Sequence, residues 1–410
     1  MRRRSSLVLL TLAVFCVALA PLLREYAFPR LVAKALNSDQ AYKVMVLEAD
    51  NATLFGAPEG DGKAKAYIIQ TVKPNPDEAT GQSVVWDMNL AMVDSTGKVV
   101  TQIPERYVFD AVSQAPKNCC GEQIDGKPVA HTGIQYKWPF FVQKRGYNYY
   151  DAQAHTAATI DYKGTENFNG LEVYRFEQSV PWTKVPVPSQ LPGGLTPESV
   201  EQAGMERWYT TVRTFWVEPV TGAPVYAEEK HREEMRTPNP DDPAHPGVLV
   251  VFDGHVKMLP AWSNALIADA KDQRAQMLLI HDQLPLGLVV VGVVLFLVAL
   301  LLEFLGRRKK ADPATGGGTR GDDASPSGPG GSGNEGTAGR EPVAVGASGG
   351  GAGANAAETA VLPRVADSPP LSGVTSESAA VAADAPAPAS NGKTPATAFP
   401  DRPTSPPPAS

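Results

Sequence analysis

Two adjacent cysteines, Cys119 and Cys120, are the residues whose types and spacing point most directly to chemistry. Adjacent Cα atoms across a trans peptide lie about 3.8 Å apart, below the lower limit of about 4.4 Å that is usual for a disulfide. A bond between the two thiols would therefore be strained and easily reduced. Because we expect this segment to lie in an oxidising compartment, we predict a vicinal disulfide. Two free thiols or an intermolecular bridge are the alternatives.

The six histidines give weaker evidence for a functional site, because none has the spacing of a metal-binding motif. His231 is the most suggestive, since four glutamates lie within three positions of it. A cation site is one interpretation of this segment, and a solvated strand end is the one that we favour. Residues 346–350 match the G-x-S-x-G nucleophile motif, but no strand precedes them and no helix follows them. We therefore predict no catalytic residue, no cofactor and no metal, and a protein that is not an enzyme.

Composition separates the C-terminal hundred residues from the rest of the chain. Residues 311–410 are rich in Ala, Gly, Pro, Ser and Thr and carry ten acidic against five basic residues, which is most of the net charge of -7. Such a segment buries too little apolar surface to offset the entropy of ordering, so we predict a disordered tail over 306–410. Thr359, Ser368 and Thr394 are its candidate phosphorylation sites. The remainder has no basic patch interleaved with aromatic residues, so we expect no nucleic acid partner.

Two apolar segments predict two membrane-spanning helices. Residues 5–23 are uncharged, and about 19 helical residues come close to crossing a hydrocarbon core of ~30 Å. A cleaved signal peptide is the alternative for this segment, and Pro21, directly after Ala20, argues against cleavage. Residues 284–305 are apolar almost throughout and form the second predicted span.

The basic residues near the outer ends of both spans are Arg2, Arg3, Arg4, Arg307, Arg308, Lys309 and Lys310. Under the positive-inside rule they place both termini in the cytoplasm and the middle of the chain outside it. The predicted organisation is a cytoplasmic N-terminus (1–4), a span (5–23), a helical stalk (24–36), an extracytoplasmic domain (37–259), a second stalk (260–283), a second span (284–305) and the tail (306–410). The cell membrane is the expected location, and membrane lipid an expected partner.

The middle segment has the pattern of short strands separated by turns. Runs rich in Val, Ile, Tyr, Phe, Trp and Thr alternate with Gly, Pro, Asn and Asp. The candidate strands are 42–49, 64–72, 83–93, 98–103, 106–111, 134–141, 147–151, 157–163, 171–180, 207–218, 224–232 and 248–258. We predict a mainly β fold with a large antiparallel sheet system, either a sandwich or a partly closed barrel. A capped helix is predicted to begin after Thr196 and to end near Gly204.

The predicted strand 207–218 is apolar or aromatic on both faces, which indicates that both faces are at least partly covered. A central strand between two packed layers is the interpretation that we favour. The functional alternative is a strand that lines an apolar ligand groove. Its candidate lining residues are Trp208, Tyr209, Phe215 and Trp216.

Three stretches of the middle segment resemble a known family when they are taken together. They are Trp138 to Phe141 leading through Lys144 to Tyr147 and Asp151, Gly170 to Phe176, and Thr214 to Gly222. They resemble the actinobacterial porin A family, whose members share the layout of span, outside domain and span. The resemblance covers about residues 2–308 and excludes the tail. It implies a channel in the outer envelope and supplies no catalytic residue.

From the residues themselves we expect a non-enzymatic envelope protein whose outside domain binds or passes an apolar or amphipathic ligand, such as a lipid, or docks an envelope component. A channel-forming porin is the first alternative. A signalling or scaffold protein that acts through its tail is the second. The sequence does not indicate an oligomeric state.

Overall fold

The computed structural model describes residues 2–41, 43–57, 62–239, 241–242 and 246–308. Within these residues the chain divides into two units, one formed by residues 2–15 and 291–308 and the other by residues 16–290. The larger unit carries the sheet. The predictions for Lys309, Lys310, Thr359, Ser368, Thr394 and the tail lie outside the described residues.

Helices occupy both ends of the described chain. At the N-terminal end the helices are α1 (Arg2–Pro21), the π-helix η1 (Leu22–Ala27) and α2 (Phe28–Leu36). At the C-terminal end they are α4 (Pro260–Leu278), the π-helix η5 (Leu279–Gln283) and α5 (Leu284–Arg308). Two helical stretches of the described chain, Ser5–Leu36 and Pro260–Leu305, are long and apolar enough to cross a membrane. Most large apolar side chains of α1 and α5 are exposed, as a lipid-facing helix requires.

All described strands between these helices belong to one antiparallel sheet of 12 strands. The strands are β1 (Lys43–Leu54), β2 (Lys63–Pro74), β3 (Ser83–Val93), β4 (Val99–Asp110), β5 (Gln123–Ile124), β6 (Lys127–Pro128), β7 (Tyr147–Asp151), β8 (Thr156–Phe168), β9 (Leu171–Lys184), β10 (Glu206–Val217), β11 (Pro224–Thr237) and β12 (Gly247–Met258). The mainly β prediction is confirmed. The sheet is single, unlike a sandwich, and it is not closed.

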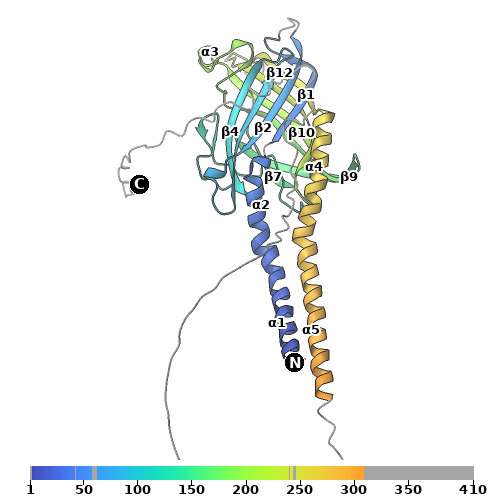
Figure 1. Ribbon diagram of the computed structural model, residues 1–410. Helices are drawn as coiled ribbons and strands as arrows, with labels where there is room; N and C mark the ends of the chain where they lie inside the picture. Colours follow the sequence, from blue (N-terminus) through green and yellow to red (C-terminus); the bar gives the residue numbers. More distant parts are fainter. Residues whose placement is uncertain (1, 42, 58–61, 240, 243–245, 309–410) are drawn as a thin grey trace, which may run out of the picture. The chain divides into compact units, whose positions relative to one another are not determined.

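The sheet consists of two meanders that meet in its centre. β1 to β6 follow one another outward on one side, and β12 to β7 do so on the other, so β1 and β12 are neighbours (Figure 1). Their pairing brings Leu47 opposite Met258 and Thr53 opposite Asp253, with an irregularity between the two pairs. We call this pairing the seam. β6 and β7 form the two edges of the sheet.

Two strand predictions differ from the structure. The predicted strands 98–103 and 106–111 are one strand, β4, because Pro104 lies where β4 is almost an edge strand: β5 pairs only with Glu105 and Arg106. The predicted strand 134–141 is a loop with positive φ angles at Tyr136 and Phe141. Trp138 and Phe140 are buried as aromatic residues of a strand would be, but Trp138 packs with β7 to β10 and Phe140 with β2, β3 and β4. The loop meets the edge of the sheet where Ile134 forms a single bridge with Tyr149 of β7.

Short helices complete the larger unit. They are the 3₁₀-helices η2 (Asp39–Ala41), η3 (Pro76–Glu78) and η4 (Pro192–Gly194) and the helix α3 (Pro197–Gln202). As predicted, the Thr196 side chain caps α3 by accepting a hydrogen bond from the Ser199 backbone N–H. The chain leaves this helix through Gly204, whose φ of 62° is in the left-handed region that glycine tolerates.

Helix α4 packs against the sheet and fixes the end of the seam. Trp262 joins the apolar cluster formed by β1, β2, β3, Ala227 of β11 and the end of β12, and Ile267 joins a second cluster with β9 and β11. Ion pairs join this helix to the rest of the unit, between Lys43 and Asp269 at 2.5 Å and between Arg274 and Glu218 at 2.9 Å. The sheet, the loop beside its edge and α4 therefore form one packed body in which the candidate site lies.

Candidate functional site

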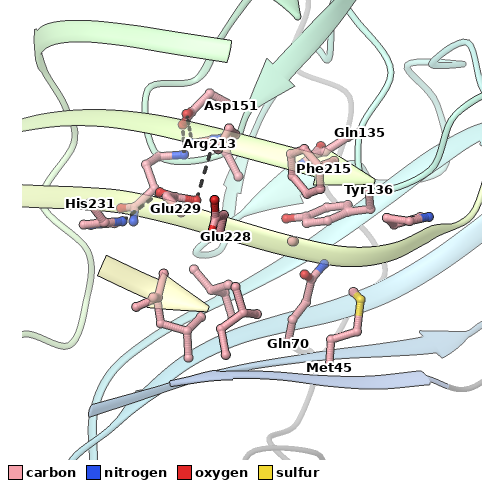
Figure 2. Close-up of a pocket in the computed structure, with 18 of the residues that line it drawn as sticks. Met45, Gln70, Gln135, Tyr136, Asp151, Arg213, Phe215, Glu228, Glu229 and His231 are labelled. Atoms are coloured by element: carbon pink, nitrogen blue, oxygen red, sulfur yellow. Dashed lines mark hydrogen bonds and ion pairs between the residues drawn. The ribbon is translucent and has the colours of Figure 1, made fainter. Parts of the chain in front are cut away.

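A cavity of about 110 Å³ lies between the two meanders of the sheet. Its apolar wall comes from both sides of the seam: Met45, Leu47, Ile68, Leu90, Val256 and Met258. Its polar side chains include Gln70 on β2, Gln135 in the loop before β7, and Arg213 on β10. Figure 2 shows Met45 and Gln70 on one side of the cavity, pointing toward Tyr136 and Phe215 on the other. The cavity thus has an apolar wall and a polar part.

Strand β11 supplies a buried row of charges beside the cavity. Glu229, His231 and Glu233 alternate along the strand, so their side chains share one face. His231 Nδ1 is 2.9 Å from Glu229 Oε1, and its Nε2 is 2.7 Å from Glu233 Oε1. We call these three residues the His231 ladder. His231 is only 4% exposed, so the predicted solvated strand end is wrong for this residue.

Two arginines of β10 neutralise the carboxylates of the His231 ladder. Arg207 Nη2 lies 2.6 Å from Glu233 Oε2, and Arg213 Nε lies 3.6 Å from Glu229 Oε2. Arg213 also donates from Nη2 to Asp151 Oδ2 on β7, at 2.5 Å (Figure 2). Charged residues from three strands thereby form one buried network.

The pKa values of the His231 ladder follow from this network. Burial alone would lower the pKa of His231, but its hydrogen bonds to Glu229 and Glu233 raise it to about 9. Burial would raise the pKa of Glu229, yet Arg213 and His231 lower it to about 2. The pKa of Glu233 is likewise lowered to about 2 despite its burial, chiefly by Arg207 and His231. At neutral pH the ladder therefore consists of an imidazolium between two carboxylates.

A second buried histidine occupies a similar arrangement on the other meander. His131 Nε2 lies 2.9 Å from Glu105 Oε1 on β4, and its Nδ1 lies 2.7 Å from Glu122 Oε2. We call these three residues the His131 cluster. Burial lowers the pKa of His131, but hydrogen bonds to the two carboxylates raise it to about 9. The ring of Tyr150 on β7 packs against His131 with a centroid distance of 4.5 Å, so the cluster links β4 to the edge strand β7.

The His131 cluster also connects the cavity to the cysteine pair. Glu105 Oε2 accepts hydrogen bonds from Tyr136 Oη at 2.6 Å and from Gln135 Nε2 at 3.2 Å, and both of these residues line the cavity. On the other side, the Glu122 backbone N–H donates to Cys119 O at 3.3 Å. The structure joins Cys119 and Cys120 by a disulfide. A continuous set of contacts therefore runs from that disulfide to the cavity wall.

The structure divides the four candidate lining residues of strand 207–218 between the two faces of β10. Tyr209 and Phe215 line the cavity. Trp208 lies on the opposite face, 4.8 Å from the Arg236 guanidinium, and Trp216 donates from Nε1 to Glu166 at 2.8 Å. Strand alternation separates odd from even positions, so these two tryptophans do not face the cavity.

Sequence reasoning missed most of the polar residues at the cavity. The spacing of Glu229, His231 and Glu233 could have indicated a shared buried face, because all three lie two positions apart. No sequence signal pairs Arg213 with Asp151, which lies on another strand. Among the described residues no group of three or more His, Cys, Asp or Glu is arranged to hold a metal ion.

An open antiparallel sheet with an internal, partly polar cavity, in a chain with a long apolar helix near each end of its described part, defines a class of mainly β proteins with two candidate membrane spans. Comparison with known families gives a more specific result. The family model for the porin PorA family matches residues 5–301, which is most of the chain. The chain belongs to the porin PorA family, and the resemblance inferred from the three sequence stretches is confirmed. Membership makes it a porin-like protein of the cell envelope.

Two curated relatives carry the same name. The chain is 30% identical over 156 residues to Porin PorA of Corynebacterium amycolatum, a match that covers 30% of this chain and 39% of the relative. It is 29% identical over 180 residues to Porin PorA of Corynebacterium resistens, covering 32% of this chain and 43% of the relative. The matched part thus spans less than half the length of either relative.

Proposed function

We propose that this porin-like envelope protein is anchored by two membrane-spanning helices and that its β-rich part, outside the cytoplasm, binds the end of an apolar or amphipathic ligand. The cavity between the meanders carries this proposal. Its volume of about 110 Å³ is close to that of an apolar cavity that accepts a benzene-sized molecule, ~150 Å³. The cavity therefore suits one end of a lipid-like molecule rather than the whole of it.

The walls of the cavity support an amphipathic ligand. Methionine, leucine, isoleucine and valine side chains from β1, β2, β3 and β12 form the apolar wall, and methionine in particular adapts its shape to different ligands. Arg213 and Gln135 give the same cavity polar groups that can orient a ligand. A cavity with apolar and polar walls suits an amphipathic ligand, which has apolar and polar surfaces.

Small-molecule mass spectrometry of the full chain purified from its membrane tests the binding proposal. Ala227 lines the cavity and is 8% exposed, so the series Ala227→Val, Ala227→Leu and Ala227→Phe should fill it progressively. We expect the amount of retained amphiphile to fall in that order. Ala203→Phe, at an exposed position after α3, is the control and should retain as much as the parent chain. A parent chain that retains no amphiphile contradicts the proposal.

Thiol labelling of intact cells tests the proposed orientation. Lys163 is a residue of β8 with a partly exposed side chain, and Ser325 belongs to the predicted cytoplasmic tail. An impermeant thiol reagent should label Lys163→Cys in whole cells and Ser325→Cys only after lysis. The parent chain supplies the background from its own cysteines. Labelling of both positions in intact cells would exclude the two-span orientation.

Channel formation is the second candidate, because both curated relatives are named porins. Reconstitution of the purified full chain into a planar bilayer measures this activity directly. Steps of conductance that persist in the Ala227→Phe variant would favour a channel that is independent of the cavity. A scaffold role for the tail stays a sequence-based proposal, since the tail lies outside the described residues.

A further inference from the structure

Within the described chain, three buried polar atoms at the cavity lack a hydrogen-bond partner: Gln70 Nε2, Gln135 Oε1 and Arg213 Nε. Arg213 Nε lies 3.6 Å from Glu229 Oε2, which is too far for a hydrogen bond. A buried polar atom without a partner destabilises a protein by about 1–3 kcal/mol. Three such atoms around one cavity indicate that a polar group of a ligand completes their hydrogen bonds.

Two of these atoms have fixed hydrogen-bonding roles. Gln135 points its amide nitrogen at Glu105 Oε2, and a carboxylate can only accept, so the atom left without a partner is the amide oxygen. Gln135 is 2% exposed, and this oxygen is an acceptor without a donor among the described residues. Arg213 Nε can only donate, because guanidinium has no acceptor. The Gln70 amide can present either role after rotation. The missing group must therefore both donate and accept.

The charges around the cavity disfavour an ionic group on the ligand. Its lining includes the carboxylates of Asp151, Glu228 and Glu229, and the cations of Arg213 and His231. Both cations already contact carboxylates: Arg213 that of Asp151, and His231 that of Glu229. An anion would meet three carboxylates and, among these described lining residues, no cation free of a partner; a cation would lie beside the Arg213 guanidinium. Either ion would be desolvated without adequate compensation.

We propose that the cavity binds the hydroxyl-bearing end of an uncharged amphiphile. The hydroxyl group donates to Gln135 Oε1 and accepts from Arg213 Nε, while the adjoining alkyl chain lies along Leu47, Ile68 and Met258. This inference rests on the proposed function, because it names the class of ligand for the same cavity. The proposal excludes amphiphiles of the same chain length whose head group is a carboxylate or a quaternary ammonium.

Four probes with the same ten-carbon chain test the inference on the purified full chain in amphipol: 1-decanol, decanoate, decyltrimethylammonium and n-decane. Binding is measured by titration calorimetry at neutral pH. We expect 1-decanol to bind at least about tenfold more tightly than either ion, since a buried ion lacks a partner here. Equal or tighter binding of an ion, or of n-decane, overturns the hydroxyl assignment while leaving the binding proposal intact. Failure of all four probes to bind overturns the binding proposal itself.

Two matched variants, one at the cavity and one away from it, test whether Gln135 binds the hydroxyl group. Gln135→Leu removes the acceptor with little change of volume, and we expect 1-decanol affinity to fall by about three- to tenfold with n-decane affinity unchanged. Gln178→Leu is the control, because Gln178 is equally buried and its amide oxygen also lacks a partner within the described chain, but it does not line the cavity. If Gln135→Leu does not fold, Gln135→Met serves the same comparison, because it also lacks the amide oxygen and its thioether is only a weak acceptor. Equal losses in the cavity and control variants would overturn the assignment.

Discussion

The His231 ladder and the His131 cluster each hold a buried imidazole between two carboxylates. The two differ in the neighbouring groups that compensate the charges of those carboxylates. In both, two carboxylates hold the histidine, and its pKa is raised to about 9 in spite of burial. The ladder comes from one strand and is neutralised by arginines, whereas the carboxylates of the cluster receive hydrogen bonds from tyrosine, glutamine and backbone N–H groups. Because Arg207 and Arg213 compensate the charges of its carboxylates, the ladder can lie beside a cavity. The cluster instead fastens a loop between the two meanders.

The largest effect should come from replacing each histidine by leucine. In His131→Leu the carboxylates of Glu105 and Glu122 lose their cation, and no guanidinium of the described chain pairs with them, so we expect a loss of about 5 kcal/mol in the free energy of unfolding. In His231→Leu the two carboxylates keep Arg213 and Arg207, so the loss should be smaller, about 3 kcal/mol. Urea unfolding followed by tryptophan fluorescence measures both.

Substitution of the second carboxylate controls for this comparison. In the double variant His131→Leu with Glu122→Gln, one uncompensated charge is gone, and part of the lost stability should return. The equivalent change at Glu233 should not restore stability to His231→Leu, because it would leave Arg207 without its carboxylate partner. A larger loss of stability in His231→Leu than in His131→Leu would contradict the proposed difference between the ladder and the cluster.

The pH dependence should be the same for both histidines. A histidine whose pKa rises from 6.5 to about 9 on folding stabilises the protein fully below pH 6.5, and that stabilisation is lost as the pH rises through about 9. The stability difference between the parent chain and His231→Leu should therefore narrow by on the order of 3 kcal/mol over this range. The same should hold for His131→Leu.

The parent curve alone does not test this prediction, because Lys137 acts in the opposite sense. Burial lowers the pKa of Lys137 to about 7, so its contribution to stability increases as the pH rises above that value. Lys137 is present in parent and variant, and its contribution cancels in the difference. A difference that stays constant between about pH 6.5 and 9.5 would show that the histidine is not protonated in the folded state.

The smallest effect should come from the cysteine pair. Cys119→Ser with Cys120→Ser removes a ring of two residues, so the stability change should be below about 1 kcal/mol. Glu122 donates a backbone hydrogen bond to Cys119 and its carboxylate contacts His131. An effect of the double substitution should therefore appear in the part of the pH dependence of stability that is due to His131, and the part due to His231 should be unchanged. Intact mass without reductant should be lower by two hydrogens than the reduced mass. Alkylation of both Cys119 and Cys120 in the untreated monomer would exclude the disulfide, whereas Cys16 is a free thiol in either case.

Local patterns in the sequence predicted most of the sheet and little of the site. Alternation and turn residues identified most of the strands, and the Thr196 cap identified α3, because these signals depend on neighbours in sequence. Alternation along strand 207–218 also separates Tyr209 and Phe215 from Trp208 and Trp216. The strand prediction for 134–141 is wrong because Trp138 and Phe140 are buried by tertiary packing rather than by strand pairing. Contacts such as Asp151 with Arg213 join separate strands, and a single sequence carries no record of them.

The seam also determines the order in which the sheet can assemble. Each meander consists of strands that pair with their neighbours in sequence, so each can form early and locally. Of the strands, β1 is made first and β12 last, and the pairing of Leu47 with Met258 must wait until the whole sheet has been synthesised. Until then β1 presents an unpaired edge on which a second chain could pair. Seam formation should therefore limit the rate of folding, and chains that stop before β12 should aggregate through β1.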